Sequence, residues 1–147
     1  FHRHFSICNH NAYDRLLKME FVLSATVTLV TLGIYFRVLA NVSKVRGKTN
    51  IWGPATSGSF ELECAIRSQT NLTEHLVIFL PLLWLCAWLN SDLVAAILGS
   101  LFPVGRILYA RYYPTGHRMG FLIQLFSEIA LFFAVSVGLV FSAVQNS

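Results

Sequence analysis

Charged residues are scarce in this sequence. Asp, Glu, Lys and Arg make up 12% of its 147 residues, hydrophobic residues make up 55%, and the mean hydropathy is +0.60. An ordinary soluble domain has about a quarter charged residues, so this composition excludes that class and indicates an integral membrane protein. The net charge of +4 is modest. It bears on membrane topology, and we expect no nucleic-acid partner.

Cysteine motifs of the kind that bind zinc are absent from the sequence. The three cysteines are an odd number, and they form no C-x-x-C motif. Cys64 and Cys86 fall within expected helices, so we expect neither a disulfide framework nor a metal site. The sequence also lacks internal repeats and low-complexity tracts, which disfavours a small transporter built from repeats.

The first 18 residues differ from the rest in being polar and rich in His and Asn, and an apolar run opens only after Met19. We expect residues 1–18 to be a disordered or non-native extension, and residues 19–147 to form one transmembrane domain. Metal binding by the histidines of the first segment is the alternative; these are His2, His4 and His10.

Four apolar segments are long enough to cross a bilayer, which takes about 20 helical residues. They cover residues 21–40, 60–89, 93–113 and 121–144. The pattern predicts an all-α integral membrane protein, folded as an up-down-up-down four-helix bundle. A signal peptide cleaved after Ala40 is the alternative for the first segment, but an uncleaved helix fits its length better.

Positive charge distinguishes the two ends of this bundle. The expected loops 41–59 and 114–120 carry Lys or Arg, whereas the turn 90–92 carries neither. The basic residues of the first loop are Lys44, Arg46 and Lys48. The positive-inside rule therefore places both basic loops in the cytoplasm and both termini outside. We expect a multi-pass protein of the inner membrane in a bacterium, or of the endoplasmic reticulum or another endomembrane in a eukaryote.

The segment 60–89 carries many polar residues in its first half. A helix advances about 100° per residue, so Asn71 lies at about 40° and Glu74 at about −20° from Arg67, on one stripe. Ionisable groups on a membrane helix are costly unless they pair or bind a ligand. From these residues alone both explanations stay open, namely interhelical ion pairs and a ligand site.

The segment 93–113 has a similar stripe near its end. Arg106, Tyr109 and Tyr113 lie within about 60° of one another on one face. Both stripes lie at the cytoplasmic ends of their helices, so they can meet around one ligand. Arginine holds a carboxylate through a planar two-pronged contact, and a glutamate accepts an ammonium group. The set therefore suits a small anion with two carboxylates and one amine.

Two motifs in these segments resemble the signature of the MAPEG family, the membrane-associated proteins of eicosanoid and glutathione metabolism. The first is Arg67-x-Gln69-x-Asn71-x-x-Glu74, preceded by Pro54-Ala-Thr-x-Gly58 and Glu61-x-Glu63. The second is Arg106-x-x-Tyr109-x-x-x-Tyr113. The overall pattern, over residues 19–147, is most similar to the microsomal glutathione transferase type.

The resemblance implies a homotrimer that binds glutathione, as co-substrate, between neighbouring subunits near the cytosolic face. By motif position, the implied glutathione-binding residues are Arg67, Gln69, Asn71, Glu74, His75, Arg106, Tyr109 and Tyr113. Arg118 is the implied catalytic residue, because a family arginine after the third helix contacts the glutathione sulfur. A carboxylate of the ligand is implied to meet Lys44 or Arg46. Gln69 points about 200° away from Arg67, which an intersubunit site explains.

The implied activity is that of a detoxifying glutathione transferase with a peroxidase side activity and no metal. The thiolate is the nucleophile, and a guanidinium beside the sulfur favours it over the thiol. It would attack a lipophilic electrophile, or reduce a lipid hydroperoxide, arriving from the bilayer. A non-enzymatic member of the family that binds and presents lipid is the alternative. His75 stands where the leukotriene-synthase branch often has Tyr, so eicosanoid specificity is not implied.

A further polar pair lies in the segment 121–144, where Gln124 and Glu128 are one helical turn apart. A carboxylate within a membrane helix needs a partner. We expect Glu128 to pair with Arg106 or Arg111, and a proton relay is the alternative.

Overall fold

The computed structural model describes residues 20–145, and these form four long α-helices and no strand. The helices are α2 (Val22–Thr49), α3 (Phe60–Leu89), α4 (Asp92–Tyr112) and α5 (Arg118–Gln145). Each helix is long and apolar enough to cross a membrane. The predicted all-α fold with four spans is confirmed, and the chain is a multi-pass integral membrane protein. The extension expected at 1–18 lies outside the described residues.

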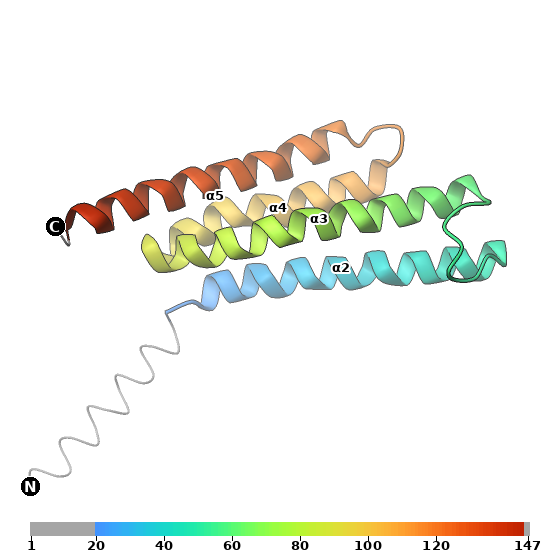
Figure 1. Ribbon diagram of the computed structural model, residues 1–147, viewed down its shortest axis with the longest axis horizontal. Coiled ribbons are helices and arrows are strands. Elements are labelled where there is room, and N and C mark those ends of the chain that lie inside the picture. The colour runs from blue at the N-terminus through green and yellow to red at the C-terminus, as the bar shows by residue number, and fades with distance from the viewer. Residues whose placement is uncertain (1–19, 146–147) are drawn as a thin grey trace, which may run out of the picture.

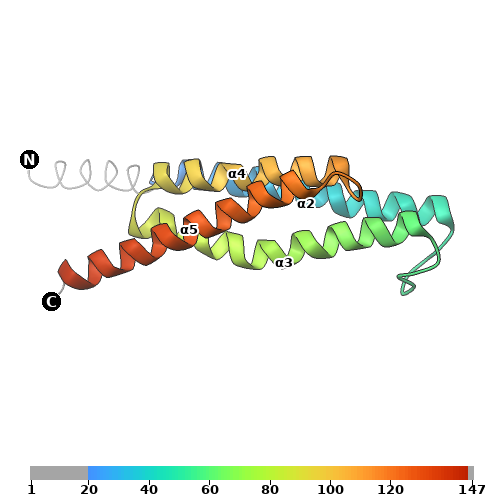
Figure 2. The same cartoon turned by 90° about the horizontal axis from the view of Figure 1, so that it is seen from above.

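The four helices run alternately up and down the bundle (Figure 1). As a result α2 and α4 run in one direction, while α3 and α5 run in the other. The middle of the bundle is formed by α3 and α4, each of which packs against both α2 and α5. The α2–α3 and α4–α5 loops lie towards the same end, opposite the α3–α4 turn (Figure 2). The candidate polar stripes of α3 and α4 therefore share one end of the bundle.

The first helix is longer than the sequence predicted. A loop was expected over 41–59, but α2 continues to Thr49 and ends at Asn50, whose φ of 54° is left-handed. That expectation was wrong because residues 41–49 contain no proline and only one glycine, so nothing there breaks the helix. The basic residues lie instead on the last turns of α2, where positive charge is favourable.

Two of these basic side chains hold the loop that follows α2. The Arg46 Nη1 atom donates to the carbonyl oxygens of Ile51, at 3.2 Å, and Ala55, at 2.8 Å. The ammonium group of Lys48 lies 2.8 Å from a carboxylate oxygen of Glu61, at the start of α3. These contacts fix where the chain enters α3. They therefore also fix the position of the polar first turns of α3 along the bundle.

The opposite end of the bundle is tied together by the short α3–α4 turn. The two carboxylate oxygens of Asp92 each accept a backbone N–H at 2.8 Å, from Leu23 and from Ser24. A helix leaves its first N–H groups without partners, and a carboxylate there is stabilising. The side-chain amide of Asn90 also donates to the carbonyl of Ala134 in α5, at 3.0 Å. One turn thus fixes the start of α2 and the second half of α5.

Two glycines allow α4 and α5 to pack with their backbones in close contact. A Cβ atom on Gly105 would lie 2.7 Å from the backbone nitrogen of Gln124, and one on Gly120 would lie 2.7 Å from the carbonyl oxygen of Gly105. Neither backbone atom can move away as a flexible side chain could. This close approach brings Gln124 beside α4, where the candidate site lies.

Replacing either glycine by alanine should therefore destabilise the protein. For Gly105→Ala and Gly120→Ala we expect a loss of about 1–3 kcal/mol, as overpacking typically causes. Gly33→Ala is the matched control, since a Cβ there meets no atom within 4 Å. Thermal unfolding of the detergent-purified variants measures the difference. Equal stability of all three variants would contradict the close packing of α4 on α5.

Candidate functional site

A buried guanidinium lies at the centre of the candidate site. Arg106 of α4 is 1% exposed. Its Nη1 atom donates to Asn71 Oδ1 of α3 at 2.7 Å and to Gln124 Oε1 of α5 at 2.8 Å. The Nη2 atom donates to the backbone carbonyl of Ser68, at 3.2 Å. One side chain therefore joins three helices at the level of the predicted site.

The acceptors of this guanidinium are neutral oxygens, and it also lies over an aromatic ring. The carbon at its centre is 4.6 Å from the centroid of the Tyr109 ring, a favourable cation–π distance. Within residues 20–145, the Arg106 Nε and Gln124 Nε2 atoms are buried without a hydrogen-bond partner. Buried polar groups normally have hydrogen-bond partners, so these two donors can still bond to a further acceptor.

Glu128 does not pair with Arg106 or Arg111, so that prediction was wrong. The Glu128 carboxylate instead contacts the His75 Nδ1 atom, at 2.9 and 3.0 Å. The physical reason is the register of α3 and α5, which run in the same direction. Since Gln124 lies level with Asn71, the residues one turn further along both helices also meet, and these are Glu128 and His75.

The polar contacts therefore form consecutive layers across the bundle. The first holds Arg106, and the second holds the His75–Glu128 pair, with the edge of the imidazole on the Phe121 ring. Beyond them Phe79 stacks on Phe102 with ring centroids 4.0 Å apart, in a wholly apolar layer. The buried charged and amide side chains, Arg106, Gln124 and Glu128, thus lie towards one end of the bundle.

Aromatic rings cover the Arg106 layer on the loop side. Tyr109, Tyr113 and His117 pack together with ring centroids 5.2–5.3 Å apart. The His117 Nδ1 atom donates to the carbonyl of Pro114, at 2.7 Å, which orients the imidazole. Tyr109 is buried, whereas Tyr113 is partly exposed. Of the two predicted tyrosines of α4, Tyr109 thus lies against the Arg106 guanidinium, and Tyr113 stacks on Tyr109.

The remaining predicted residues are on the surface of this single chain. Arg67 and Glu74 approach to 3.9 Å, and their side chains are more than half exposed. Such an exposed pair contributes little stability, so both groups are accessible to a ligand. Gln69 is partly buried on α3, and Arg118 is exposed at the start of α5. Neither reaches the Arg106 layer.

The structure thus brings some of the predicted site residues together and leaves others apart. Asn71, Arg106, Tyr109 and Tyr113 adjoin one another, whereas His75 belongs to the next layer. The sequence interpretation did not assign a site role to Gln124 or His117. Gln124 could have been found from its polarity within an apolar segment, but nothing in the sequence marks His117 beyond its place in a short loop.

Similarity to known proteins covers most of the chain. The MAPEG family model matches residues 24–139. An uncharacterized protein of Synechocystis sp. is 36% identical over 119 residues, which make up 79% of this chain and 87% of that protein. Microsomal glutathione S-transferase 2 of Homo sapiens is 33% identical over 88 residues, 60% of each chain.

Leukotriene C4 synthase of Mus musculus is 32% identical over 97 residues, or 66% of this chain and 65% of the synthase. The chain therefore spans less than two thirds of the length of either enzyme. In both alignments the identity is about one third, which indicates common ancestry. Identity at this level does not by itself assign an activity to the chain.

The Arg106 network makes a direct prediction about stability. Replacing Gln124 by leucine removes one acceptor from a buried guanidinium, which should cost about 1–3 kcal/mol of unfolding free energy. Thr73→Val is the control, because in the described part of the chain its exposed hydroxyl bonds only to the Gln69 carbonyl of its own helix. Chemical unfolding in detergent compares the two variants. A Gln124→Leu protein as stable as Thr73→Val would show that the network is not needed for folding.

Proposed function

The chain belongs to the MAPEG family, and on that premise we propose that it is a membrane-bound, glutathione-dependent transferase. The observation that carries the proposal is the contact between two motif residues from different helices, the 2.7 Å hydrogen bond from Arg106 to Asn71. This bond brings the polar stripes of α3 and α4 into one constellation. Relatives at about one third identity include a glutathione S-transferase and a leukotriene C4 synthase, which supports this class of activity.

The exposed members of the set suit the charges of glutathione. Arg67 offers a bidentate contact to a carboxylate, and Glu74 offers an acceptor to an ammonium group. The two lie 3.9 Å apart and more than half exposed, so each can exchange its present partner for the ligand. Asn71, held by Arg106, presents a fixed polar group between them and the aromatic cluster.

The site is completed by a neighbouring subunit in this proposal. Gln69 lies on the opposite side of α3 from Arg67, so one tripeptide bound to a single chain cannot meet both. Many large apolar side chains are exposed on the helices, for example Leu29 at 70% and Val77 at 70%, and these can face either lipid or a second subunit. We place glutathione between subunits of a homotrimer, near the loop end of the bundle.

Catalysis depends on the form of the glutathione sulfur. A free thiol is mostly protonated at neutral pH, and each unit by which its pKa falls corresponds to about 1.4 kcal/mol. We assign Arg118 to the sulfur, where its guanidinium favours the thiolate. In conjugation the thiolate forms a bond to an electrophilic carbon, and the leaving group departs with the electron pair of the bond that breaks.

The second substrate is a lipophile that enters from the bilayer. Binding both reactants at the edge of the membrane makes the reaction effectively intramolecular. In the peroxidase reaction the thiolate forms a bond to the terminal oxygen of a lipid hydroperoxide, the O–O bond breaks, and the alkoxide that leaves takes up a proton to become the alcohol. A second glutathione then reduces the resulting sulfenic acid, and glutathione disulfide and water are formed.

Arg118→Leu should retain glutathione binding but lose the ultraviolet absorbance of the bound thiolate. The physical reason is the loss of the positive charge that favours the anion. We expect conjugation of a chlorinated nitrobenzene to fall by about tenfold for each unit by which the thiol pKa rises. The measurements are difference absorbance on glutathione addition and the turnover rate in detergent.

Arg118→Lys is the matched control, because it keeps the charge and should keep part of the thiolate signal. Unchanged turnover in Arg118→Leu would move the role to another basic residue. A properly assembled wild-type protein with neither thiolate absorbance nor conjugation activity would defeat the enzyme proposal. Such a result would instead favour a non-enzymatic, lipid-binding member of the family.

A further inference from the structure

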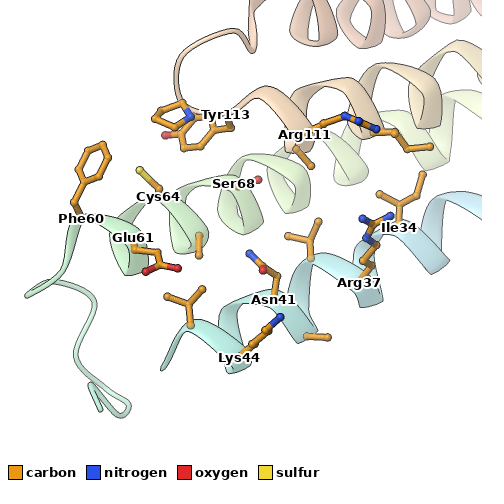
Figure 3. Close-up of a pocket in the computed structure, with 17 residues that line it drawn as sticks. Ile34, Arg37, Asn41, Lys44, Phe60, Glu61, Cys64, Ser68, Arg111 and Tyr113 are labelled. Carbon is orange, nitrogen blue, oxygen red and sulfur yellow. The ribbon is translucent and has the colours of Figure 1, made fainter. Parts of the chain in front are cut away.

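A cavity of about 960 Å³ lies between α2, α3 and α4 at the loop end of the bundle. Figure 3 shows Arg37, Asn41 and Lys44 in order along α2, with Cys64 on α3 across from them. Of the eight residues assigned above to glutathione, only Tyr113 lines this cavity. Lys44, the alternative to Arg46 as the partner of a glutathione carboxylate, also lines it, but Arg37, Arg111 and the rest of the wall take no part in the proposed transferase chemistry.

The part of the cavity wall that α2 forms includes a stripe of three polar side chains. Asn41 follows Arg37 by four residues and Lys44 follows it by seven, so the three lie within about 60° of one another. From the other side, α4 contributes Arg111. Three cations on two helices thus surround one space.

These three cations lack the oxygen partners that two other basic residues at the end of α2 have. Within residues 20–145, Arg37, Lys44 and Arg111 take part in no hydrogen bond or ion pair, whereas Arg46 and Lys48 have oxygen partners. The carboxylate on the cavity wall belongs to Glu61, and both its oxygens already accept from Lys48, at 3.0 and 2.8 Å. The cavity therefore has an excess of positive charge.

The depth of Arg37 makes this excess costly in an empty cavity. Arg37 precedes the end of α2 by 12 residues, so it lies about 18 Å along the helix from Thr49. Its neighbour Phe36 is 67% exposed, so α2 presents apolar surface at this level. A cation at such a depth is normally paired or placed on a ligand pathway.

The walls become apolar towards the centre of the bundle. Ile34 lies one turn deeper than Arg37 on α2, and Ile107 lies one turn deeper than Arg111 on α4. Ile107 is 48% exposed, so this part of the cavity is open at the side of the helix. A cationic zone above an apolar, laterally open zone is complementary to a molecule with an anionic head and a hydrocarbon chain.

We propose that this cavity binds an amphiphile with an anionic headgroup. The phosphate or carboxylate lies between Arg37 and Arg111, with Lys44 nearer the rim. The acyl chain passes Ile34 and Ile107 towards the bilayer. A phospholipid of the surrounding leaflet and a free fatty acid share this chemistry, and the experiment below distinguishes these two sources.

Cys64 provides a native reporter for occupancy. It lines the cavity and is partly exposed, whereas Cys86 is buried in the core and serves as an internal control. The full chain in maltoside detergent is treated with a maleimide, and peptide mass spectrometry follows each cysteine separately. The probes are dioleoylphosphatidylglycerol, oleate and dioleoylphosphatidylcholine.

We expect an anionic probe, but not phosphatidylcholine, to slow the modification of Cys64. Neutralising both arginines, as Arg37→Gln with Arg111→Gln, should raise the half-protecting concentration by about tenfold or more, since each basic residue adds to anionic-lipid affinity. The pair Arg37→Lys with Arg111→Lys keeps the charges and should keep most of the protection. Neither arginine has a partner within the described residues 20–145, so unfolding temperatures without lipid should be unchanged.

The two anionic probes identify the source of the ligand. Protection by phosphatidylglycerol alone assigns the cavity to a bilayer phospholipid, and protection by oleate alone assigns it to a free fatty acid. Equal protection by phosphatidylcholine would overturn the proposal, as would undiminished protection in the double glutamine variant. Slow modification of Cys64 in lipid-free protein would also overturn it, because a second copy of the chain would then cover the cavity.

Discussion

The buried guanidinium of Arg106 is the interaction on which the rest of this structure depends. Moving a charge out of water costs several kcal/mol even after relaxation, so a buried guanidinium needs hydrogen-bond acceptors around it. Asn71 of α3, Gln124 of α5 and the Ser68 carbonyl supply acceptors, and the Tyr109 ring lies against the cation. These contacts hold α3, α4 and α5 at one level, which is the level of the candidate site.

The shared direction of α3 and α5 extends this constraint along the bundle. Once Asn71 and Gln124 are level, His75 must meet Glu128, and the second polar layer follows from the first. The glycine contact between α4 and α5 makes the arrangement possible, because a Cβ on Gly120 would lie against the α4 backbone. The hydrogen bonds of the buried polar groups and the close packing of α4 on α5 therefore favour the same register of the helices.

The spans and the membrane class could be predicted from hydropathy, and the motif residues from their helical spacing. Periodicity assigns a residue to a face of its helix, but it does not tell which residues of two helices are level. For this reason the partner of Glu128 was predicted wrongly, and Gln124 was not assigned to the site. The length of α2 was underestimated because basic residues suggest a loop, although they are also common at the ends of helices.

The central claim is that Arg106 organises half of a glutathione site and that a second subunit provides the rest. Mixed assembly of two inactive variants tests it most directly, with Gln69→Leu in one subunit and Glu74→Gln in the other. If the site is shared, some interfaces in the mixture combine an intact Gln69 with an intact Glu74, and conjugation activity should reappear well above both parents. Activity that stays at the level of the parents, in protein shown to contain both variants in one assembly, would contradict a shared site.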